Sequence, residues 1–220
     1  ARRSPEPSPV SAAVRLVASD LDGTLLGMGD VVSERTRRAI AALVERGVHV
    51  MAATGRSQWT AASLVAPVDG MDLVVCSNGA SLYHVRREES LASYPIADAV
   101  VDAIVRILAT ELPGCCYGWE TEEALHYDRG FVAFRPEGDK DASPDLTPAP
   151  RPLPIRKLMI GHPEIRHHAL LDLILPLLPL TCLGSTSGAA FVEVTGEGID
   201  KAFGVQRVCA ALGIAAEEVL

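Results

Sequence analysis

The chain has 220 residues, a length that suits one large domain or a core domain with a second domain inserted into it. Apolar residues make up 48% of the chain and charged residues 22%, which is an ordinary composition for a globular protein. The net charge of −8 argues against nucleic acid or an anionic membrane as a partner, because both would repel the chain. A phosphorylated small molecule is repelled in the same way, so a phosphate site here has to supply its own local positive charge.

The first 80 residues alternate between apolar strands and helices. Three strands are expected, at residues 14–20, 48–53 and 72–76. Two helices are expected between them, one from the N-cap candidate Ser33 to Gly47 and one over residues 58–65. This alternation with short loops predicts an α/β fold with a parallel sheet and crossover helices.

Polar residues follow the carboxyl end of each expected strand. Asp20, Thr54 and Asn78 each lie just past such an end. Ligands of open parallel sheets bind at this edge, so the sequence predicts one site there to which all three residues contribute.

The middle of the chain departs from the first pattern. An amphipathic helix opens at Asp98 and is followed by strand-like runs at residues 115–120 and 124–128. Residues 134–154 contain six prolines and are expected to form an irregular, mobile loop. Four more elements are expected after it: a strand at 155–160, a helix at 163–175, and strands at 181–183 and 190–194. The middle therefore reads as an insert of the α+β kind.

The two ends of the chain and the cysteines complete the sequence-based expectations. A final helix is expected between Gly198 and Gly213, and residues 214–220 lead towards another strand. Residues 1–13 lack the apolar segment of a signal peptide and are expected to form a flexible leader, and no run of 18 apolar residues is present. The five cysteines match no metal motif, so we interpret them as thiols in a reducing, cytoplasmic environment.

The strongest chemical signal is Asp20-Leu-Asp22-Gly23-Thr24 at the end of the first strand. Two carboxylates two residues apart repel each other, and a divalent cation is the obvious compensating charge. Gly23 permits a sharp turn that aims backbone N–H groups at an anion. A solvated acidic turn is the alternative when this motif stands alone.

Four motifs together resemble the haloacid dehalogenase superfamily, and more narrowly its Cof-type, subclass IIB sugar-phosphatase branch. They are Asp20-Leu-Asp-Gly-Thr24, Ala53-Thr-Gly-Arg56, Ser77-Asn-Gly-Ala80 and Gly198-Ile-Asp-Lys201. The resemblance runs from about residue 14 to residue 220. It implies a Rossmann-like parallel-sheet core, residues 14–82 and 193–220, with an α+β cap domain over residues 83–192 inserted between the second and third motifs.

Chemistry and the resemblance assign roles to five residues. Asp20 is the candidate nucleophile, and Asp22 is the candidate acid that protonates the leaving oxygen and then the base that activates water. Thr54 and Gly55 are expected to hydrogen-bond the phosphate, and Lys201 to supply the local positive charge. The metal candidates are Asp20 and Asp22, with Mg²⁺ bound by the first carboxylate and, by resemblance, by the second residue's backbone carbonyl.

Some of these assignments stay open at the level of sequence. Thr54 could cap a helix, and Lys201 could be a solvated helix residue. Arg56, Asn78 and Gly79 are possible substrate contacts, although they could instead brace the loops around the site.

The sequence therefore predicts a magnesium-dependent phosphomonoester hydrolase that acts on a sugar phosphate or a similar small metabolite through an aspartyl-phosphate. A phosphosugar mutase of the same superfamily and a non-catalytic phosphometabolite-binding protein are the alternatives. A phospho-accepting receiver would need its acceptor Asp after the third strand, where this chain has Ser77-Asn78. The resemblance also implies a fourth, acidic motif with a third magnesium ligand. Since the sequence stops at Leu220, where the strand before it should begin, we expect the C-terminal part of the core to be missing, with a weaker metal site as the result.

Overall fold

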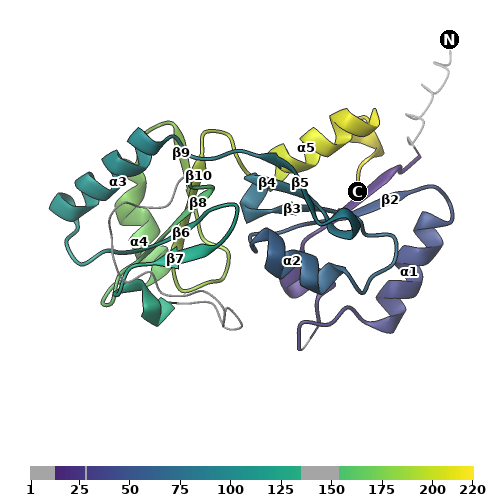
Figure 1. The fold of residues 1–220 in the computed structure, drawn as a ribbon, viewed down its shortest axis with the longest axis horizontal. Helices are drawn as coiled ribbons and strands as arrows, with labels where there is room; N and C mark the ends of the chain where they lie inside the picture. Colours follow the sequence, from purple (N-terminus) through teal and green to yellow (C-terminus); the bar gives the residue numbers. More distant parts are fainter. Residues whose placement is uncertain (1–12, 28, 135–153) are drawn as a thin grey trace, which may run out of the picture.

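The computed structural model describes residues 13–27, 29–134 and 154–220, which form two bodies, each built on a five-stranded sheet (Figure 1). The expected leader, apart from residue 13, lies outside the described residues. The expected proline-rich loop also lies outside them, apart from its two end residues. Among the described helices, none has the length and apolar character needed to cross a membrane.

The first body, called the core below, contains a sheet with the strand order β1-β2-β3-β4-β5. Its strands are β1 (Leu16–Ser19), β2 (His49–Ala53), β3 (Leu73–Cys76), β4 (Ser81–His84) and β5 (Glu89–Ser93). The first three strands are parallel, as predicted, and the last three are antiparallel. The core is therefore a parallel sheet extended by a hairpin that the sequence did not reveal.

Helices cover both faces of the core sheet. They are α1 (Glu34–Val44), α2 (Gln58–Val65) and α5 (Lys201–Leu212). Val50 and Ala52 of β2 pack with α1 and α2, whereas Met51 and Ala53 pack with α5 on the opposite face. Because both faces are buried, β2 is apolar at every inner position, which is why it reads as a continuous apolar run.

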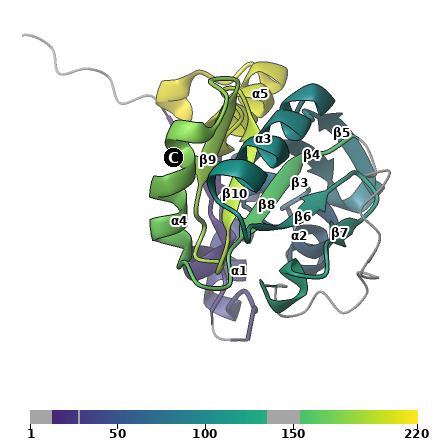
Figure 2. The ribbon, with the colours of Figure 1, turned by 90° about the vertical axis from the view of Figure 1, so that its left-hand side faces the viewer.

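The second body, called the cap below, contains an antiparallel sheet with the order β7-β6-β8-β10-β9. Its elements are α3 (Asp98–Glu111), β6 (Cys116–Glu120), β7 (Leu125–Tyr127), β8 (Lys157–Gly161), α4 (His167–Ile174), β9 (Cys182–Ser185) and β10 (Val192–Gly196). Both helices pack on one face of this sheet, the face away from the core, as Figures 1 and 2 show. The opposite face is thereby left for the contact with the core.

The sheets divide the chain at other points than the sequence-based boundaries, 82/83 and 192/193. The rest of β4 and all of β5 belong to the core sheet, because β4 turns back onto β3 with Ser81 opposite Cys76. All of β10 belongs to the cap sheet, where it pairs with β8 and β9. Single elements also shift: the cap helix α4 begins at His167 rather than at residue 163, and β8 begins at Lys157 rather than at 155.

The end of the described chain lies beside β1. Leu16 and Val219 form a parallel bridge, and the Leu220 N–H donates to the Leu16 carbonyl at 2.9 Å. The Ala18 N–H in turn donates to the Leu220 carbonyl at 2.8 Å. This agrees with the expectation that residues 214–220 lead towards another strand, and it gives β1 hydrogen-bonded neighbours on both edges.

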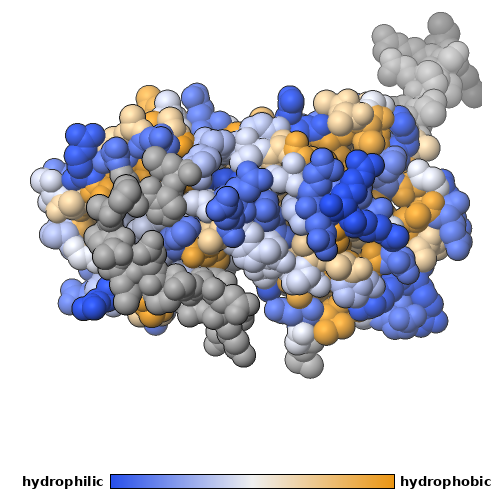
Figure 3. Space-filling view, viewed as in Figure 1, coloured by the Kyte–Doolittle hydropathy of each residue, from blue (hydrophilic) through white to orange (hydrophobic). Residues whose placement is uncertain are grey.

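The surface between and over the two bodies mixes residue types. On the face seen in Figure 3, hydrophilic residues are interspersed with apolar ones over both bodies.

Short helical turns complete the described structure at Leu21–Leu25, Ser77–Gly79, Val85–Arg87, Phe131–Phe134, Leu175–Leu177 and Ala216–Glu218.

Candidate active site

The carboxyl edge of the core sheet opens into a cavity of about 1080 Å³ between core and cap. Asp20 follows β1, Gly55 lies two residues after β2, and Asn78 lies two residues after β3, and all three line this cavity. The start of α5 contributes Lys201 to the same wall. The structure thus brings together the polar clusters that the sequence places after three separate strands.

Asp20 and Lys201 form the charged centre of this wall. The Lys201 ammonium lies 2.9 Å from Oδ2 of Asp20, and the two side chains are 35% and 40% exposed. Oδ1 of Asp20 accepts from the Leu21 N–H at 2.8 Å, which fixes the carboxylate at the strand end. Asp200 caps α5 by accepting from the Phe203 N–H, so the helix presents Lys201 at its first turn. Lys201 is therefore beside the candidate nucleophile and is not simply a solvated helix residue.

Asp22 is held by Arg56. The Arg56 Nη2 donates to Asp22 Oδ1 at 2.6 Å, its Nε contacts both carboxylate oxygens, and Nη2 also lies 3.2 Å from Asp30 Oδ2. The hydrogen bond to Asp22 raises the pKa of Arg56 by more than partial burial lowers it. Of the two roles considered for Arg56, the structure shows it bracing the acidic loop, while a contact to substrate remains a prediction.

Thr54 and Gly55 form a tight loop after β2. Thr54 is fully buried, and its hydroxyl oxygen accepts from the Arg56 N–H at 3.1 Å. It does not cap the following helix, because the N-cap of α2 is Ser57. A Cβ at position 55 would come within 2.8 Å of the Asn78 side-chain oxygen, so only glycine fits between the two loops without a shift. Thr54 is not among the residues that line the cavity, so its expected hydrogen bond to phosphate remains a prediction.

Asn78 and Gly79 join the third loop to its neighbours. The Asn78 N–H donates to the Thr54 carbonyl at 3.0 Å, and its side-chain amide donates to Glu193 of the cap at 3.1 Å. Gly79 has φ +100°, and a Cβ there would lie 1.9 Å from the Asp200 carbonyl oxygen. Gly79 therefore lets the start of α5 approach the loop, and its role as a substrate contact is still only a prediction.

Two of the three charged cap residues at this site, Lys157 and Glu193, were missed by the analysis of the sequence. Lys157 of β8 lies between Glu193 of β10, at 2.8 Å, and Glu120 of β6, at 3.4 Å, and all three side chains are almost completely buried. Burial disfavours the charged ammonium, yet the attraction of the two carboxylates is stronger and raises the pKa of Lys157. The only local signal is a charged residue inside an apolar strand, which does not say what the residue faces.

The charge of the lining makes a cation a suitable occupant. The cavity wall carries the acidic residues Asp20, Asp22, Asp30, Glu120, Glu193 and Asp200 against the cations Arg56, Lys157 and Lys201. Over residues 13–27, 29–134 and 154–220, no group of three or more His, Cys, Asp or Glu side chains is placed to hold a metal. Mg²⁺ is commonly held by one or two carboxylates with waters and substrate phosphate, so the pair Asp20 and Asp22 fits it as a partial donor set.

Comparison with known proteins places this site in a family context. The family model for haloacid dehalogenase-like hydrolases matches residues 17–220. The 5-amino-6-(5-phospho-D-ribitylamino)uracil phosphatase YcsE of Bacillus subtilis (strain 168) is 31% identical over 70 residues, which are 32% of this chain and 28% of that protein. The HMP-PP phosphatase of Serratia proteamaculans (strain 568) is 31% identical over 124 residues, 56% of this chain and 39% of the relative. The chain thus matches less than half the length of these two curated relatives.

The fold has close structural counterparts. The structure of BT4131, a HAD subclass IIB sugar phosphatase, superposes with a TM-score of 0.71 at 20% identity, covering 94% of this chain and 79% of that one. At this identity the likeness concerns the fold, which is an α/β core with a parallel-containing sheet and a second, antiparallel sheet.

Proposed function

The chain belongs to the haloacid dehalogenase-like hydrolases, and from this premise we propose that it hydrolyses small phosphomonoesters with Asp20 as the nucleophile. The observation that carries the proposal is the 2.9 Å contact between Lys201 and Asp20 beside the Thr54-Gly55 loop. A carboxylate, a cation and a hydroxyl at one edge of the sheet are the groups needed to attack phosphorus and to hold its oxygens.

Magnesium is the cofactor we propose for this site. Asp20 would hold it through its carboxylate, and Asp22 through its backbone carbonyl. A divalent cation there would neutralise charge on the transferring phosphoryl group. The excess of carboxylates in the lining supports this part of the proposal, because a dianionic phosphate is otherwise repelled.

The residues divide the reaction into two displacements. An Asp20 oxygen forms a bond to phosphorus while the bond to the leaving oxygen breaks, and Asp22 gives that oxygen a proton. Water then attacks phosphorus, Asp22 takes its proton, and the bond to Asp20 breaks to release phosphate. Both Asp22 oxygens accept from Arg56 in the structure, so this contact has to loosen before Asp22 can reach a leaving group.

We propose a sugar phosphate or a similarly small phosphorylated metabolite as the substrate. The two curated relatives are named as phosphatases of small phosphorylated compounds, and the matched fold is that of a sugar phosphatase. The cavity of about 1080 Å³ has room for a leaving group of that size, because ligand pockets typically have volumes of about 300–1,000 Å³.

The test is the Asp20→Asn variant of the full-length protein, assayed with Mg²⁺ on a panel of sugar phosphates. Turnover should fall by on the order of 10³-fold or more, because an amide is a poor nucleophile. The matched control is Asp72→Asn, since Asp72 is also 40% exposed and also pairs with a cation, Arg86, but does not line the cavity. Retained turnover in Asp20→Asn, or an equal loss in Asp72→Asn, would remove Asp20 from the reaction.

A further inference from the structure

Two consecutive cations at the start of β8 enter the contact between cap and core. The Arg156 side chain is fully buried, and the Lys157 side chain is 5% exposed. Buried cations require partners for their N–H groups, since the loss of hydration is otherwise very costly. The partners of the two side chains lie in different parts of the core and so indicate different roles.

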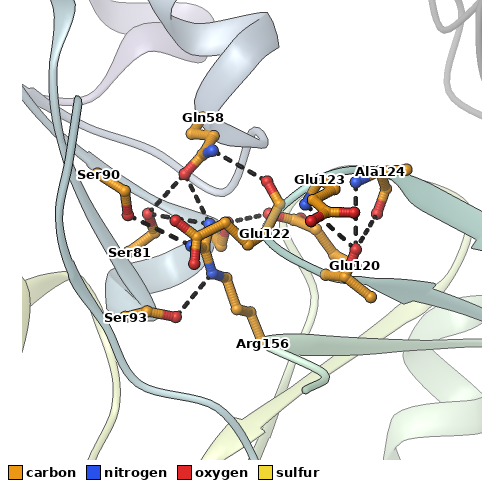
Figure 4. A network of polar contacts seen from close by, with 11 residues as sticks. Gln58, Ser81, Ser90, Ser93, Glu120, Glu122, Glu123, Ala124 and Arg156 are labelled. Atoms are coloured by element: carbon orange, nitrogen blue, oxygen red, sulfur yellow. Dashed lines mark hydrogen bonds and ion pairs between the residues drawn. The ribbon is translucent and has the colours of Figure 1, made fainter. Parts of the chain in front are cut away.

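Arg156 anchors the cap to the core away from the cavity (Figure 4). Its Nε donates to Ser93 Oγ at 2.8 Å, and its Nη1 donates to Gln58 Oε1 at 2.6 Å. Its Nη2 pairs with Glu122 of the cap at 2.8 Å. The hydroxyls of Ser81 and Ser90 accept further bonds at 3.3 Å. None of these residues lines the cavity or belongs to the loop of Thr54, Gly55 and Arg56, called the phosphate loop below, so this network joins the two bodies without touching that loop.

Lys157 instead reaches the phosphate loop itself. Its ammonium donates to the Gly55 carbonyl at 2.6 Å and to Glu193 Oε1 at 2.8 Å, and it lies 3.4 Å from Glu120 Oε2. Two of the three N–H donors of the ammonium are thereby used, and Glu120 Oε2 is an ion-pair partner without a hydrogen bond. Two carboxylates already compensate the charge of Lys157, so it is a poor candidate for binding a substrate anion, although it lines the cavity.

A short chain of hydrogen bonds leads from Lys157 to Thr54. The Gly55 carbonyl and the Arg56 N–H belong to the same planar peptide unit, and that N–H donates to the Thr54 hydroxyl oxygen at 3.1 Å. A cation on the carbonyl polarises this peptide and strengthens the bond from its N–H. The Thr54 hydroxyl is thus held as an acceptor on one side, which directs its own proton towards a different acceptor.

The two carboxylates of the cap fix the same region from the other side. Glu120 accepts a hydrogen bond from the Ser77 hydroxyl, and Glu193 accepts from the Asn78 amide at 3.1 Å. Each carboxylate therefore has one oxygen on Lys157 and one on the loop after β3. The three charged side chains pair with one another within the cap, and each also contacts a core loop, so docking of the cap adds one hydrogen bond to each of them.

Resting on the function proposed above, we propose that Lys157 is a positioning residue for the phosphate loop. From the cap, it binds the Gly55 carbonyl and thereby orients the Thr54 hydroxyl. Docking of the cap on the core therefore completes the phosphate site. Arg156 serves as the neutral comparison, because it docks the same strand on the core without contacting that loop.

The test compares Lys157→Met with Arg156→Met in the full-length protein with Mg²⁺. Binding of inorganic phosphate, measured by calorimetry, should weaken by about 10- to 100-fold in Lys157→Met, as is typical when a supporting contact behind a site is removed. Arg156→Met should keep phosphate affinity within about 3-fold, although it loses an equally buried cation from the same interface. Amide hydrogen exchange of residues 55–57 should become faster in Lys157→Met only.

A second variant covers the case in which Lys157→Met fails to fold because two carboxylates are left unpaired. Lys157→Met/Glu193→Gln keeps the net charge of the buried group unchanged and should show the same loss of phosphate affinity. Equal losses in the Lys157 and Arg156 variants, unchanged affinity in the Lys157 variants, or no phosphate binding by the wild-type protein would overturn the proposal. Because these readouts need no turnover, they separate it from the proposed chemistry, which fails independently if Asp20→Asn stays active.

Discussion

Replacement of Gly79 by alanine tests the close approach that brings α5 to the active site. A Cβ at this position would lie 1.9 Å from the Asp200 carbonyl oxygen, whereas carbon–oxygen contacts are normally about 3.3 Å, so the loop and the helix start must separate by about 1.4 Å. Positive φ costs a non-glycine residue about 1–2 kcal/mol, and overpacking adds about 1–3 kcal/mol. We therefore expect Gly79→Ala to lose about 2–5 kcal/mol of unfolding free energy.

The same displacement should reduce activity through Lys201, the residue after Asp200. Misplacement of a catalytic group by about 1 Å typically costs about 10²-fold, which is the expected fall in kcat/KM. Urea unfolding and sugar-phosphate turnover measure the two effects. Gly213→Ala is the matched control, since Gly213 also has a positive φ, +62°, but a Cβ added there would meet no neighbouring atom within 4 Å. This variant should lose only about 1–2 kcal/mol of unfolding free energy and keep its activity. Equal behaviour of the two variants would refute the steric reasoning.

Two further predictions concern protonation. Burial opposes the charge of Glu193, yet the ion pair with Lys157 holds the pKa of Glu193 below its ordinary value of 4.5. The stabilising contribution of the Glu193 carboxylate is therefore present above pH 4.5 and is lost as the pH falls through the lower pKa of the folded state. Urea midpoints taken from about pH 6 to about pH 3 should therefore fall less steeply in Glu193→Gln than in the wild type, and parallel slopes would contradict this. Burial raises the pKa of the Cys115 thiol to about 11 and raises the pKa of Cys76 further. Cys115 is the one cysteine side chain that is partly exposed. A disulfide reagent should therefore modify Cys115 first and Cys76 only on unfolding.

Elements with local end signals were predicted well from sequence. The helix α2 has the predicted bounds, residues 58–65, and Ser33 caps α1 by accepting from the Thr36 N–H. Gly213 ends α5 in the left-handed conformation, as a C-terminal glycine should. These signals lie within a few residues of the feature they specify, so a single sequence contains them.

The β4–β5 hairpin was missed because its turn lacks such a signal. The turn is made by Val85–Arg87 and by Glu88, which has φ +51° where glycine or asparagine is usual. Its strands are short and carry serine, tyrosine and histidine instead of a clear apolar alternation. The sequence-based assignment of residues 193–196 of β10 to the core was wrong for a different reason: the place of this strand in the cap sheet depends on its pairing with β8 and β9.

The residues of the candidate site also fall into those that the sequence could predict and those that it could not. Asp20, Thr54 and Lys201 belong to motifs whose residues are close in sequence and follow strand ends, so their convergence followed from the sheet alone. The bond between Lys157 and the Gly55 carbonyl joins residues 102 positions apart. It depends on the register of the cap sheet and on the way the cap meets the core, neither of which periodicity reveals.

The pairing of β1 with the end of the described chain has a consequence for biosynthesis. Arg15, at the start of this pairing, bonds Glu218, which lies 203 positions later. At a synthesis rate of about 5–20 residues per second, the first residues wait roughly 10–40 s on the ribosome before their partners are made. During that interval one edge of β1, the strand that leads to Asp20, lacks these hydrogen bonds and is open to other strands or to chaperones. The pairing of β1 with residues 218–220 is therefore a late event in the synthesis of the protein.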